Sequence, residues 1–511
     1  MTERYYITTP IYYVNGAPHI GHAYTSIAAD VLARWARLQG RAVFFLTGTD
    51  EHGQKVERAA ADAGLSPQAF ADEVSAQFQA MGRALDVSND DFIRTTEPRH
   101  HQACTALWET LAAAGDIYAG HYEGWYALRD EAFYDEDELR RLPDGTRLAP
   151  TGAPVEWVRE PNYLFRLSAY QDRLLAYYDA NPDFIGPPSR RNEVVSFVRS
   201  GLRDLSVSRS SFRWGIPVPG DPDQVMYVWL DALTNYLTAV GYPDEAAPRW
   251  PFWPADLHLV GKDIVRFHAI YWPAFLMAAG VEPPRRLFCN GWWTIDGQKM
   301  SKSLGNAIDP LALAARYGVD PLRYFLLREV PFGGDGDFSP AKLVTRLNVE
   351  LANDLGNLAQ RTLSLLARNC GGALPARAER TEDDVALLAA ADALPAALAV
   401  LLERQALHEA LEEVWRVIRA ANAYIDRQAP WALRKTDPAR MDAVLRVLAD
   451  GLRVVATVLQ PFMPGSMARM LDQLGVPPGA RALASLAEPL PAGTGLPPPQ
   501  GVFPRHVETE A

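Results

Sequence analysis

Cysteine is scarce in this sequence, and its scarcity narrows the compartments in which the protein is expected to work. Only Cys104, Cys289 and Cys370 occur among 511 residues. They are far apart and include no Cys-x-x-Cys pair, so neither a disulfide framework nor a thiolate metal clip can form. A reducing cytoplasm is therefore the expected location.

Long apolar runs, a leader and an excess of positive charge are also missing. No unbroken run approaches the ~20 apolar residues of a membrane span, and residues 1–7 show no charged and then apolar leader, so we expect neither a membrane nor a secretory protein. The 50 Lys+Arg against 62 Asp+Glu give a net charge of -12. This balance argues against nonspecific coating of nucleic acid, although a local basic groove remains compatible with it.

What the chain does contain is an ordinary globular composition, with 48% hydrophobic and 22% charged residues. Such a chain can build a core, which excludes disorder over most of its length. At about 150 residues per domain, its length suggests roughly three or four domains.

The first hundred residues alternate between strand and helix patterns. Residues 5–9 predict a strand and residues 10–18 a loop, while apolar residues at helical spacing predict a helix over 21–38 that ends at Gly40. A second buried strand follows at 42–46. Strand, helix and strand of these lengths predict a right-handed βαβ unit and therefore a parallel sheet.

The rest of the chain changes character three times. Residues 116–225 are rich in aromatics and turns, which predicts an inserted, irregular β-rich module. The α/β rhythm then returns at 227–230, 257–260 and 286–289. Nearly all of 320–475 has a helical pattern without a fixed repeat, and residues 489–500, with five prolines, predict an extended strap.

Pro18-His19-Ile20-Gly21-His22 stands between the first strand and its helix. Gly21 allows a ligand close to the backbone, the helix start offers N–H groups to an anion, and two imidazoles can donate to phosphate oxygens. Taken alone, the two histidines are also compatible with helix capping or with an ordinary surface.

Lys299-Met300-Ser301-Lys302-Ser303 is the second motif, and Gly305 follows it. Two ammonium groups on a glycine-flanked loop can close over a departing pyrophosphate. Taken alone, the string would favour a solvated basic loop. Both motifs in this order within an α/β chain are far more specific.

With both motifs, the sequence resembles a class I aminoacyl-tRNA synthetase, and within that class the methionyl-tRNA synthetase family in a zinc-free bacterial-type form without the appended C-terminal tRNA-binding domain. The resemblance extends from about residue 5 to 431 and on towards 504. It implies a Rossmann-like parallel-sheet catalytic domain split by an insertion, followed by an all-α anticodon-binding helix bundle. The implied divisions are catalytic 1–115, insertion 116–225, catalytic 226–325 with the lysine loop, bundle 326–480 and strap 481–511.

The resemblance also implies substrates and sites. It implies ATP with Mg²⁺, methionine, and methionine tRNA of both elongator and initiator type. His19, His22, Lys299 and Lys302 would be catalytic, and the ATP contacts would come from His19, Gly21, His22, Lys299, Met300, Ser301, Lys302 and Ser303. The methionine contacts would be Ile11, Tyr13, Asp50, Trp229, Ala232, Leu233, Tyr236, Ile264 and His268.

These methionine residues make chemical sense, although each has a plainer interpretation. A buried Asp50 can hold the substrate ammonium group, and an aliphatic and aromatic pocket suits a polarizable thioether. Without the resemblance, Asp50 is equally compatible with a turn at a strand end. The spacing of Trp229, Leu233 and Tyr236 then predicts a core stripe, and His268 a hydrogen-bonded core histidine.

The insertion departs from relatives that carry a zinc knuckle. Ala127 and Asp130 stand where such relatives have cysteines, so we expect no metal and a core rebuilt from apolar and aromatic residues. Residues 186–213 hold six arginines against Glu193 and Asp204, a local net charge of +4. A solvated surface explains this excess as well as contact with the tRNA acceptor stem does.

For the helical region the resemblance implies anticodon contacts by Asn357, Arg361 and Trp431. Trp431 could stack on an unpaired base, while the other two could contact base edges or phosphate. Packing within the bundle is the alternative for each of them.

The resemblance therefore implies a cytoplasmic, monomeric methionine–tRNA ligase without zinc. A synthetase for leucine, isoleucine or valine is an alternative, but those enzymes carry a longer editing insertion than 116–225. A non-catalytic RNA-binding homologue is a second alternative, which intact His19, His22, Lys299 and Lys302 disfavour. A small adenylyltransferase would not need the helical third of the chain.

Overall fold

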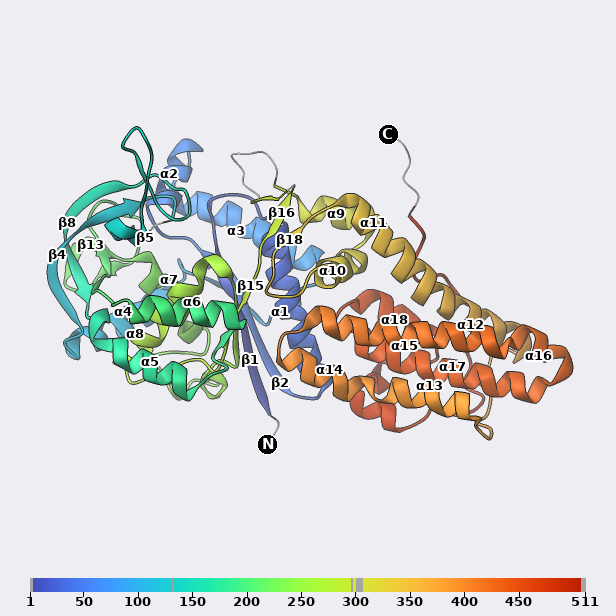
Figure 1. The fold of residues 1–511 in the computed structure, drawn as a ribbon. Coiled ribbons are helices and arrows are strands. Elements are labelled where there is room, and N and C mark those ends of the chain that lie inside the picture. Colours follow the sequence, from blue (N-terminus) through green and yellow to red (C-terminus); the bar gives the residue numbers. More distant parts are fainter. Residues whose placement is uncertain (1–2, 131, 296, 300–306, 507–511) are drawn as a thin grey trace.

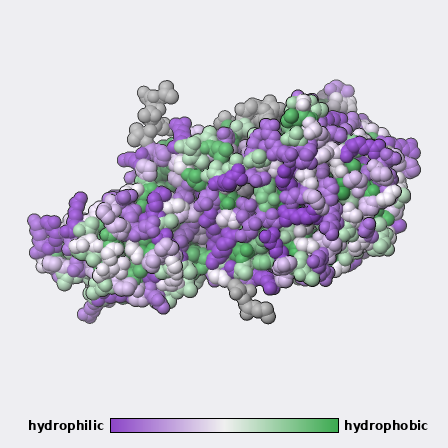
Figure 2. Space-filling model, turned by 180° about the vertical axis from the view of Figure 1, so that it is seen from behind, coloured by the Kyte–Doolittle hydropathy of each residue, from purple (hydrophilic) through white to green (hydrophobic). Residues whose placement is uncertain are grey.

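The computed structural model describes residues 3–506 except for 131, 296 and 300–306. Figure 1 shows a rounded α/β lobe, formed by the blue to green segments, beside an elongated bundle of helices in orange and red. The polar outer surface of both parts is seen from behind in Figure 2, where hydrophobic patches are scattered among hydrophilic ones.

A six-stranded parallel sheet forms the centre of the α/β lobe, in the order β3-β2-β1-β14-β15-β9. Its strands are β1 (Arg4–Tyr13), β2 (Ala42–Asp50), β3 (Asp91–Arg94), β9 (Ile185–Gly186), β14 (Leu257–Gly261) and β15 (Leu287–Asn290). Ile7 of β1 pairs with Leu257 of β14, although 250 residues separate them in sequence. The predicted parallel sheet interrupted by an insertion is thus confirmed.

The beginning of the chain follows the prediction except where β1 ends. Helix α1 (Ile20–Leu38) lies where a helix was predicted, and Gly40 after it adopts a positive φ of 83°. Strand β1, however, runs through Pro10 to Tyr13, into the predicted loop, because a register shift between Thr8 and Ile11 restores pairing with β2. Pro10 suggested a strand end, and an irregularity of this kind accommodates a residue without an N–H group.

The region predicted to be β-rich is only partly so. A long hairpin of β4 (Ile117–Ala127) and β8 (Glu156–Phe165) begins it, with β5 (Ala132–Tyr134) beside β4. Two helices then follow, α5 (Gln171–Ala180) and α6 (Pro188–Arg199), and β9 between them joins the main sheet. The proline content suggested loops, but Pro188 occupies the first position of a helix, where proline is well tolerated.

The C-terminal region is helical, as predicted. After α10 (Val319–Arg328) and α11 (Pro340–Arg346), a π-helical stretch (Leu347–Gly356) leads into α12 (Asn357–Asn369). The bundle is completed by α13 (Glu382–Asp392), α14 (Leu394–Glu403), α15 (Leu407–Gln428), α16 (Pro430–Thr436), α17 (Pro438–Leu459) and α18 (Pro464–Gln473). Helix α16 lies at the end of the bundle that points away from the α/β lobe (Figure 1).

Within the described residues, the segment Glu382–Glu403 is long and apolar enough to span a membrane, by length and composition only. The expectation of no candidate span was therefore too strict, because it required an unbroken apolar run and Asp392 interrupts this one. The segment consists of α13 and α14, whose Leu387, Leu388, Leu394 and Leu398 are buried in the bundle core. Core packing accounts for these four leucines, while only 33% of the apolar window is buried.

The chain returns along the bundle as an extended strap. Leu374 N–H donates to Thr494 O at 2.9 Å, and Phe503 packs into the main hydrophobic core. Further on, the side-chain amide of Asn348 exchanges two hydrogen bonds of 2.8 Å with the backbone of His506. The strap thereby reaches the π-helical stretch that leads from α11 to α12.

Candidate active site

The first turn of α1 is organised by its two histidines. His19 is the N-cap residue, and its Nδ1 accepts the Gly21 N–H at 3.1 Å, while Nδ1 of His22 accepts the His19 N–H at 3.1 Å. The ring centroids are 3.9 Å apart. Because both Nδ1 atoms accept, each neutral ring carries its proton on Nε2, the tautomer that can donate to a phosphate oxygen.

Gly21 is required by the way His19 folds over the turn. A Cβ atom at position 21 would lie 2.9 Å from Cε1 and 3.1 Å from Nδ1 of His19. No acidic residue occupies the first turn of α1, so the positive end of the helix dipole is not neutralised. The turn is therefore suited to an anion held close to the backbone.

The second motif enters next to this turn. Strands β16 (Trp293–Ile295) and β17 (Gln298–Lys299) form a hairpin in which Lys299 pairs with Thr294. Trp293 contacts Tyr24 of α1 edge to face at 5.8 Å, and Ile20 N–H donates to Ile308 O at 3.1 Å. The chain on both sides of the lysine loop thus borders α1, while Met300, Ser301, Lys302 and Ser303 lie outside the described residues, as does the side chain of Lys299.

Helix α7 (Val228–Thr238) forms one side of the predicted methionine site. Trp229 stacks on Phe267 with centroids 3.6 Å apart, and Ala232 and Leu233 are buried. Tyr236 lies one turn from Leu233, and its hydroxyl is 2.7 Å from Nε2 of His268.

His268 is a neutral, hydrogen-bonded histidine. Its Nδ1 lies 3.0 Å from the carbonyl oxygen of Ile264. Since a carbonyl only accepts, Nδ1 carries the proton, and Nε2 accepts from the Tyr236 hydroxyl. Burial lowers the pKa of His268 to about 4, so the ring is uncharged near neutral pH.

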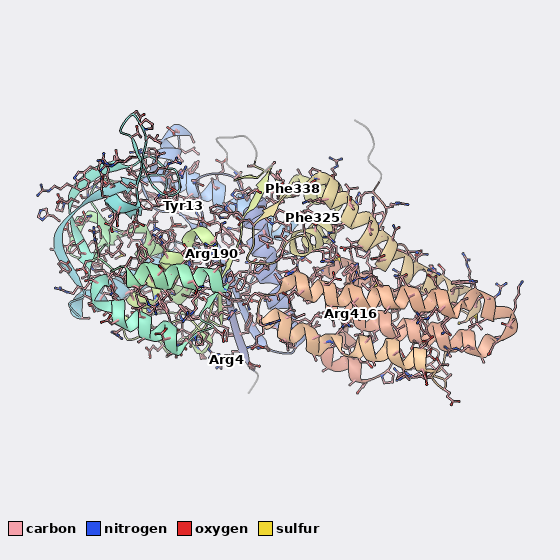
Figure 3. The ribbon with its side chains drawn as sticks, viewed as in Figure 1. Arg4, Tyr13, Arg190, Phe325, Phe338 and Arg416 are labelled. Atoms are coloured by element: carbon pink, nitrogen blue, oxygen red, sulfur yellow. The ribbon has the colours of Figure 1, made fainter. Side chains whose placement is uncertain are left out.

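Strands β1 and β2 supply the other side. Tyr13 pairs in register with Asp50, which ends β2 and is 6% exposed. Ile11 and Tyr13 pack on the same hydrophobic cluster as Trp229 and Ile264, and Figure 3 shows Tyr13 in the upper part of the α/β lobe. The predicted methionine residues are therefore contributed by β1, β2, α7 and the segment after β14.

Sequence reasoning missed the residues that fix these two sides. The Asp231 carboxylate on α7 lies 2.6 Å from Nδ1 of His52 and 2.7 Å from Nε2 of His100. Phe267 behind Trp229, and His258 stacked on Tyr236 at 4.1 Å, were also missed. No periodicity or motif marks these residues, because their partners are distant in sequence.

Two of the predicted anticodon residues, Arg361 on α12 and Trp431 on α16, contact each other, and α16 lies at the far end of the bundle (Figure 1). The Arg361 guanidinium lies 5.2 Å from the Trp431 ring centroid and 2.6 Å from the Asp426 carboxylate. Trp431 is 46% exposed, so it is not a core residue of the bundle. Asn357 is exposed one helical turn before Arg361, on the same face of α12.

At the tip of the insertion, Ala127, Ala149 and Ala153 form a small buried cluster against Tyr134 and Val155. The carboxylate of Asp130 accepts hydrogen bonds from the Tyr134 hydroxyl at 3.1 Å and from the Thr151 hydroxyl. The alanine cluster and the hydrogen bonds to Asp130 thus lie in the part of the insertion where zinc-containing relatives were expected to bind the metal.

Most of the arginines in 186–213 are engaged within the protein. Arg209 is buried among the rings of Tyr126, Phe133 and Tyr227. Arg190, Arg191, Arg203 and Arg213 each form an ion pair with a carboxylate. The local excess of positive charge is therefore less available to a phosphate backbone than the sequence suggested.

Comparison with known proteins identifies the class first. The family model for class I tRNA synthetases, in its methionine branch, matches residues 5–363, and the model for the anticodon binding domain of methionyl tRNA ligase matches residues 374–511. A methionine–tRNA ligase of Mesorhizobium japonicum is 56% identical over 99% of this chain and 98% of its own length. One of Mycobacterium bovis is 55% identical over 98% of both chains.

Solved structures agree with this class. Mycobacterium tuberculosis methionyl-tRNA synthetase in complex with methionyl-adenylate has a TM-score of 0.97 at 55% identity, covering 99% of this chain and all of its own. The free form of the same synthetase has a TM-score of 0.90 at 51% identity, covering 100% of this chain and 99% of its own. The chain belongs to the methionyl-tRNA synthetase family.

Proposed function

We propose that the chain is a methionine–tRNA ligase that uses ATP to attach methionine to methionine tRNA. The observation that carries this proposal is the family match over the whole chain, from the catalytic region to the anticodon region. The methionine carboxylate attacks the α-phosphorus of ATP, and the bond to the β-phosphate oxygen breaks to release pyrophosphate. A ribose hydroxyl of the tRNA 3′ adenosine then attacks the adenylate carbonyl, and AMP leaves.

No side chain needs to act as a nucleophile in this sequence, so positioning and charge stabilisation supply the rate. His19 and His22 donate from Nε2 to the triphosphate, and Gly21 lets it approach the start of α1. Lys299, Met300, Ser301, Lys302 and Ser303 close over it, with Lys302 acting on the charge that develops on pyrophosphate. The described contacts between α1 and both flanks of the lysine loop support this assignment.

For methionine, Asp50 holds the ammonium group, and the side chain lies among Ile11, Tyr13, Trp229, Leu233 and Ile264. Ala232 leaves room beside the indole, and the Tyr236–His268 pair closes the end of the pocket. The neutral His268 supports this assignment, since a charged ring would disfavour a thioether.

For tRNA, Trp431 stacks on an anticodon base while Asn357 and Arg361 contact base edges or phosphate. The exposure of Trp431 and the position of Arg361 over its ring support this assignment. The same division of labour assigns catalysis to 1–115 and 226–325, the connective insertion to 116–225, anticodon binding to 326–480 and the strap to 481–511.

Magnesium would enter with ATP on its phosphates, since the first turn of α1 contains no acidic residue to hold the ion. We expect no zinc in the insertion, because Ala127 and Asp130 replace thiolates. A monomer in the cytoplasm is the expected state, which size exclusion with light scattering and cell fractionation would check.

Methionine-dependent ATP–pyrophosphate exchange, with the twenty amino acids compared, tests the proposal. We expect exchange with methionine at least a hundredfold above that with leucine, isoleucine or valine. A preference for another aliphatic amino acid would identify a different synthetase. Absence of exchange with all twenty would favour a non-catalytic RNA-binding homologue.

A further inference from the structure

Asp231 is a buried carboxylate on the side of α7 that faces away from the methionine residues. At about 100° per residue, it lies nearly opposite Trp229, Leu233 and Tyr236 on the helix. Its relative exposure is 0%. A carboxylate buried this deeply must be paired or hydrogen-bonded, and Asp231 is hydrogen-bonded through both oxygens.

Its two partners come from two other parts of the lobe. Oδ2 lies 2.6 Å from Nδ1 of His52, which follows β2, and Oδ1 lies 2.7 Å from Nε2 of His100 on α4 (Pro98–Ala113). Nδ1 of His100 is in turn 3.0 Å from the Thr238 hydroxyl at the end of α7. One carboxylate thus connects the end of β2 and helix α4 to α7.

The distance between His100 and Asp231 indicates a hydrogen bond rather than two ligands of one metal ion. His100, Cys104 and Asp231 are the one group of described residues with atoms close enough to hold an ion. Ligands of a tetrahedral zinc with bonds of about 2.0 Å lie about 3.3 Å apart. Within this group Nε2 of His100 lies 3.3 Å from Sγ of Cys104 but only 2.7 Å from Oδ1 of Asp231, which is the distance of a charge-assisted hydrogen bond.

The other flank of the same turn is fixed as well. Glu51, which separates Asp50 from His52, is fully buried and accepts from Arg94 at 2.7 Å and from Thr96 at 2.6 Å. The two residues after Asp50, Glu51 and His52, are therefore both held by hydrogen bonds of their side chains. Through its side chain, His52 connects that turn to α7 by the hydrogen bond to Asp231.

We propose that Asp231, with His52 and His100 as its donors, is the positioning residue that holds the Asp50 turn in register with α7, so that the ammonium site and the side-chain pocket fit one methionine. This inference rests on the proposed function. Asp231 does not touch substrate and acts through its two imidazole partners.

The expected effect is on methionine binding rather than on the chemical step. The ammonium group keeps its charge from ground state to transition state, so misplacing Asp50 weakens both equally. Such a loss raises the KM for methionine while kcat and the KM for ATP stay nearly unchanged.

The two histidines use different ring nitrogens, which provides matched controls. An asparagine amide can place an N–H donor near the position of Nδ1, and a glutamine amide near that of Nε2. His52→Asn and His100→Gln should therefore retain the bond to Asp231. His52→Gln and His100→Asn carry the same amide group, but its N–H donor lies away from the position of the original ring nitrogen. These two variants should therefore lose the hydrogen bond to Asp231.

We expect His52→Gln and His100→Asn to raise the KM for methionine about tenfold to a hundredfold in pyrophosphate exchange, the loss of one hydrogen bond to a charged group. His52→Asn and His100→Gln should stay within about threefold of the unaltered enzyme. Asp231→Asn, which keeps the shape but removes the charge, should also raise this KM and serves if the histidine variants fold poorly.

The proposal is wrong if the asparagine and glutamine variants at each position change the KM for methionine equally. It is also wrong if kcat or the KM for ATP changes as much as the KM for methionine. Neither result contradicts the proposed function, because the unaltered enzyme would still catalyse methionine-dependent pyrophosphate exchange. An unaltered enzyme that neither exchanges pyrophosphate with methionine nor binds methionine in calorimetry would remove both.

Discussion

At the scale of single residues, burial and hydrogen bonding decide the charge state of the groups around the proposed methionine pocket. His268 is kept neutral by burial, and the two hydrogen bonds to its ring select one tautomer. Burial would raise the pKa of Asp231, but the neighbouring His52 and His100 outweigh it and hold that pKa below its usual range. Neutral and charged groups therefore lie on opposite faces of α7.

The lowered pKa of His268 predicts a loss of stability in mild acid. Its folded pKa of about 4 lies below the ~6.5 of an unfolded histidine, so between these values the unfolded chain binds more protons. Stability then falls as pH falls through this window, by about 2 kcal/mol at pH 5 from this residue alone. His268→Gln keeps an acceptor for Tyr236 but does not titrate.

Urea unfolding at pH 7 and pH 5 checks this prediction. The free energy of unfolding should fall by about 2 kcal/mol less in His268→Gln than in the unaltered protein. Other buried histidines, such as His258, are present in both proteins. Their contributions therefore cancel when the two losses of unfolding free energy are compared. An identical loss in both would show that His268 is not protonated on unfolding.

Lys302→Ala should reduce adenylate formation severely while methionine affinity stays nearly unchanged. A group that acts mainly on charge developing in the transition state lowers the rate constant more than ground-state binding. Single-turnover adenylate formation and methionine calorimetry on the same preparation measure the two effects. Unchanged rates would remove Lys302 from the mechanism.

At the scale of elements, several of the proposed functional groups stand at the ends of helices and strands. The histidine motif caps α1, Asp50 ends β2, and Trp431 is in the first turn of α16. Backbone N–H groups at helix starts have no partner within the helix, so these ends are where a ligand can be bound. The interiors of the same elements supply the core.

Trp431→Ala should lower charging of methionine tRNA about tenfold to a hundredfold, since stacking on a base contributes about 1–3 kcal/mol. Pyrophosphate exchange should be unchanged, because α16 lies at the end of the bundle away from the α/β lobe. The 46% exposure of Trp431 also predicts little change in melting temperature.

Val400→Ala is the matched control, because Val400 is an exposed apolar residue of the same bundle, on α14. It should leave charging, exchange and melting unchanged. If Trp431→Ala charges methionine tRNA normally, the anticodon assignment fails, whatever happens to its melting temperature.

The insertion tip should not depend on zinc. We expect full exchange activity after exhaustive chelation followed by magnesium repletion, since alanines and the hydrogen bonds of Asp130 form its core. Elemental analysis should find less than about one tenth of an equivalent of zinc per chain. One full equivalent would mean that histidine and carboxylate ligands bind zinc elsewhere in the protein.

At the scale of the whole molecule, one buried arginine joins the α/β lobe to the bundle. Arg323 on α10 is fully buried and donates to the Asp30 carboxylate of α1 at 2.6 Å. It also donates to the carbonyls of Pro461 at 2.8 Å and Phe462 at 3.1 Å, between α17 and α18. On the same helix, Phe325 meets Phe338 edge to face at 5.8 Å, and Figure 3 shows both close to where the lobes join.

Arg323→Met should lower the free energy of unfolding by about 3–5 kcal/mol, because it removes the fully buried cationic partner of Asp30. Arg34→Met is the matched control: Arg34 binds the same carboxylate at 2.7 Å but is partly exposed, so we expect about 1 kcal/mol or less. Urea unfolding measures both. Equal losses would mean that the junction does not depend on Arg323.

Much of the architecture was predictable from local sequence. Strands β1, β2, β14 and β15, helix α1 and the helical bundle follow from hydrophobic periodicity, which depends on residues a few positions apart, whereas the short strands β3 and β9 were not predicted. The histidine motif was predictable for the same reason, since capping a helix start needs only His19, Gly21 and His22. Helix α6 was missed because proline in a helix start looks like proline in a loop, and α5, which begins at Gln171, was missed because it lies in a stretch whose aromatics and turns suggested strands.

The sequence by itself determined the class of fold, the position of the nucleotide motif and the family to which the chain belongs, because these depend on local patterns. Only the tertiary structure decided the tautomer of His268, the exposure of Trp431 beside Arg361, and the network around Asp231. His52 and His100 lie 179 and 131 residues from Asp231 in sequence. Contacts over such separations are made by the packing of α4, α7 and the end of β2, and no periodicity in the sequence records them.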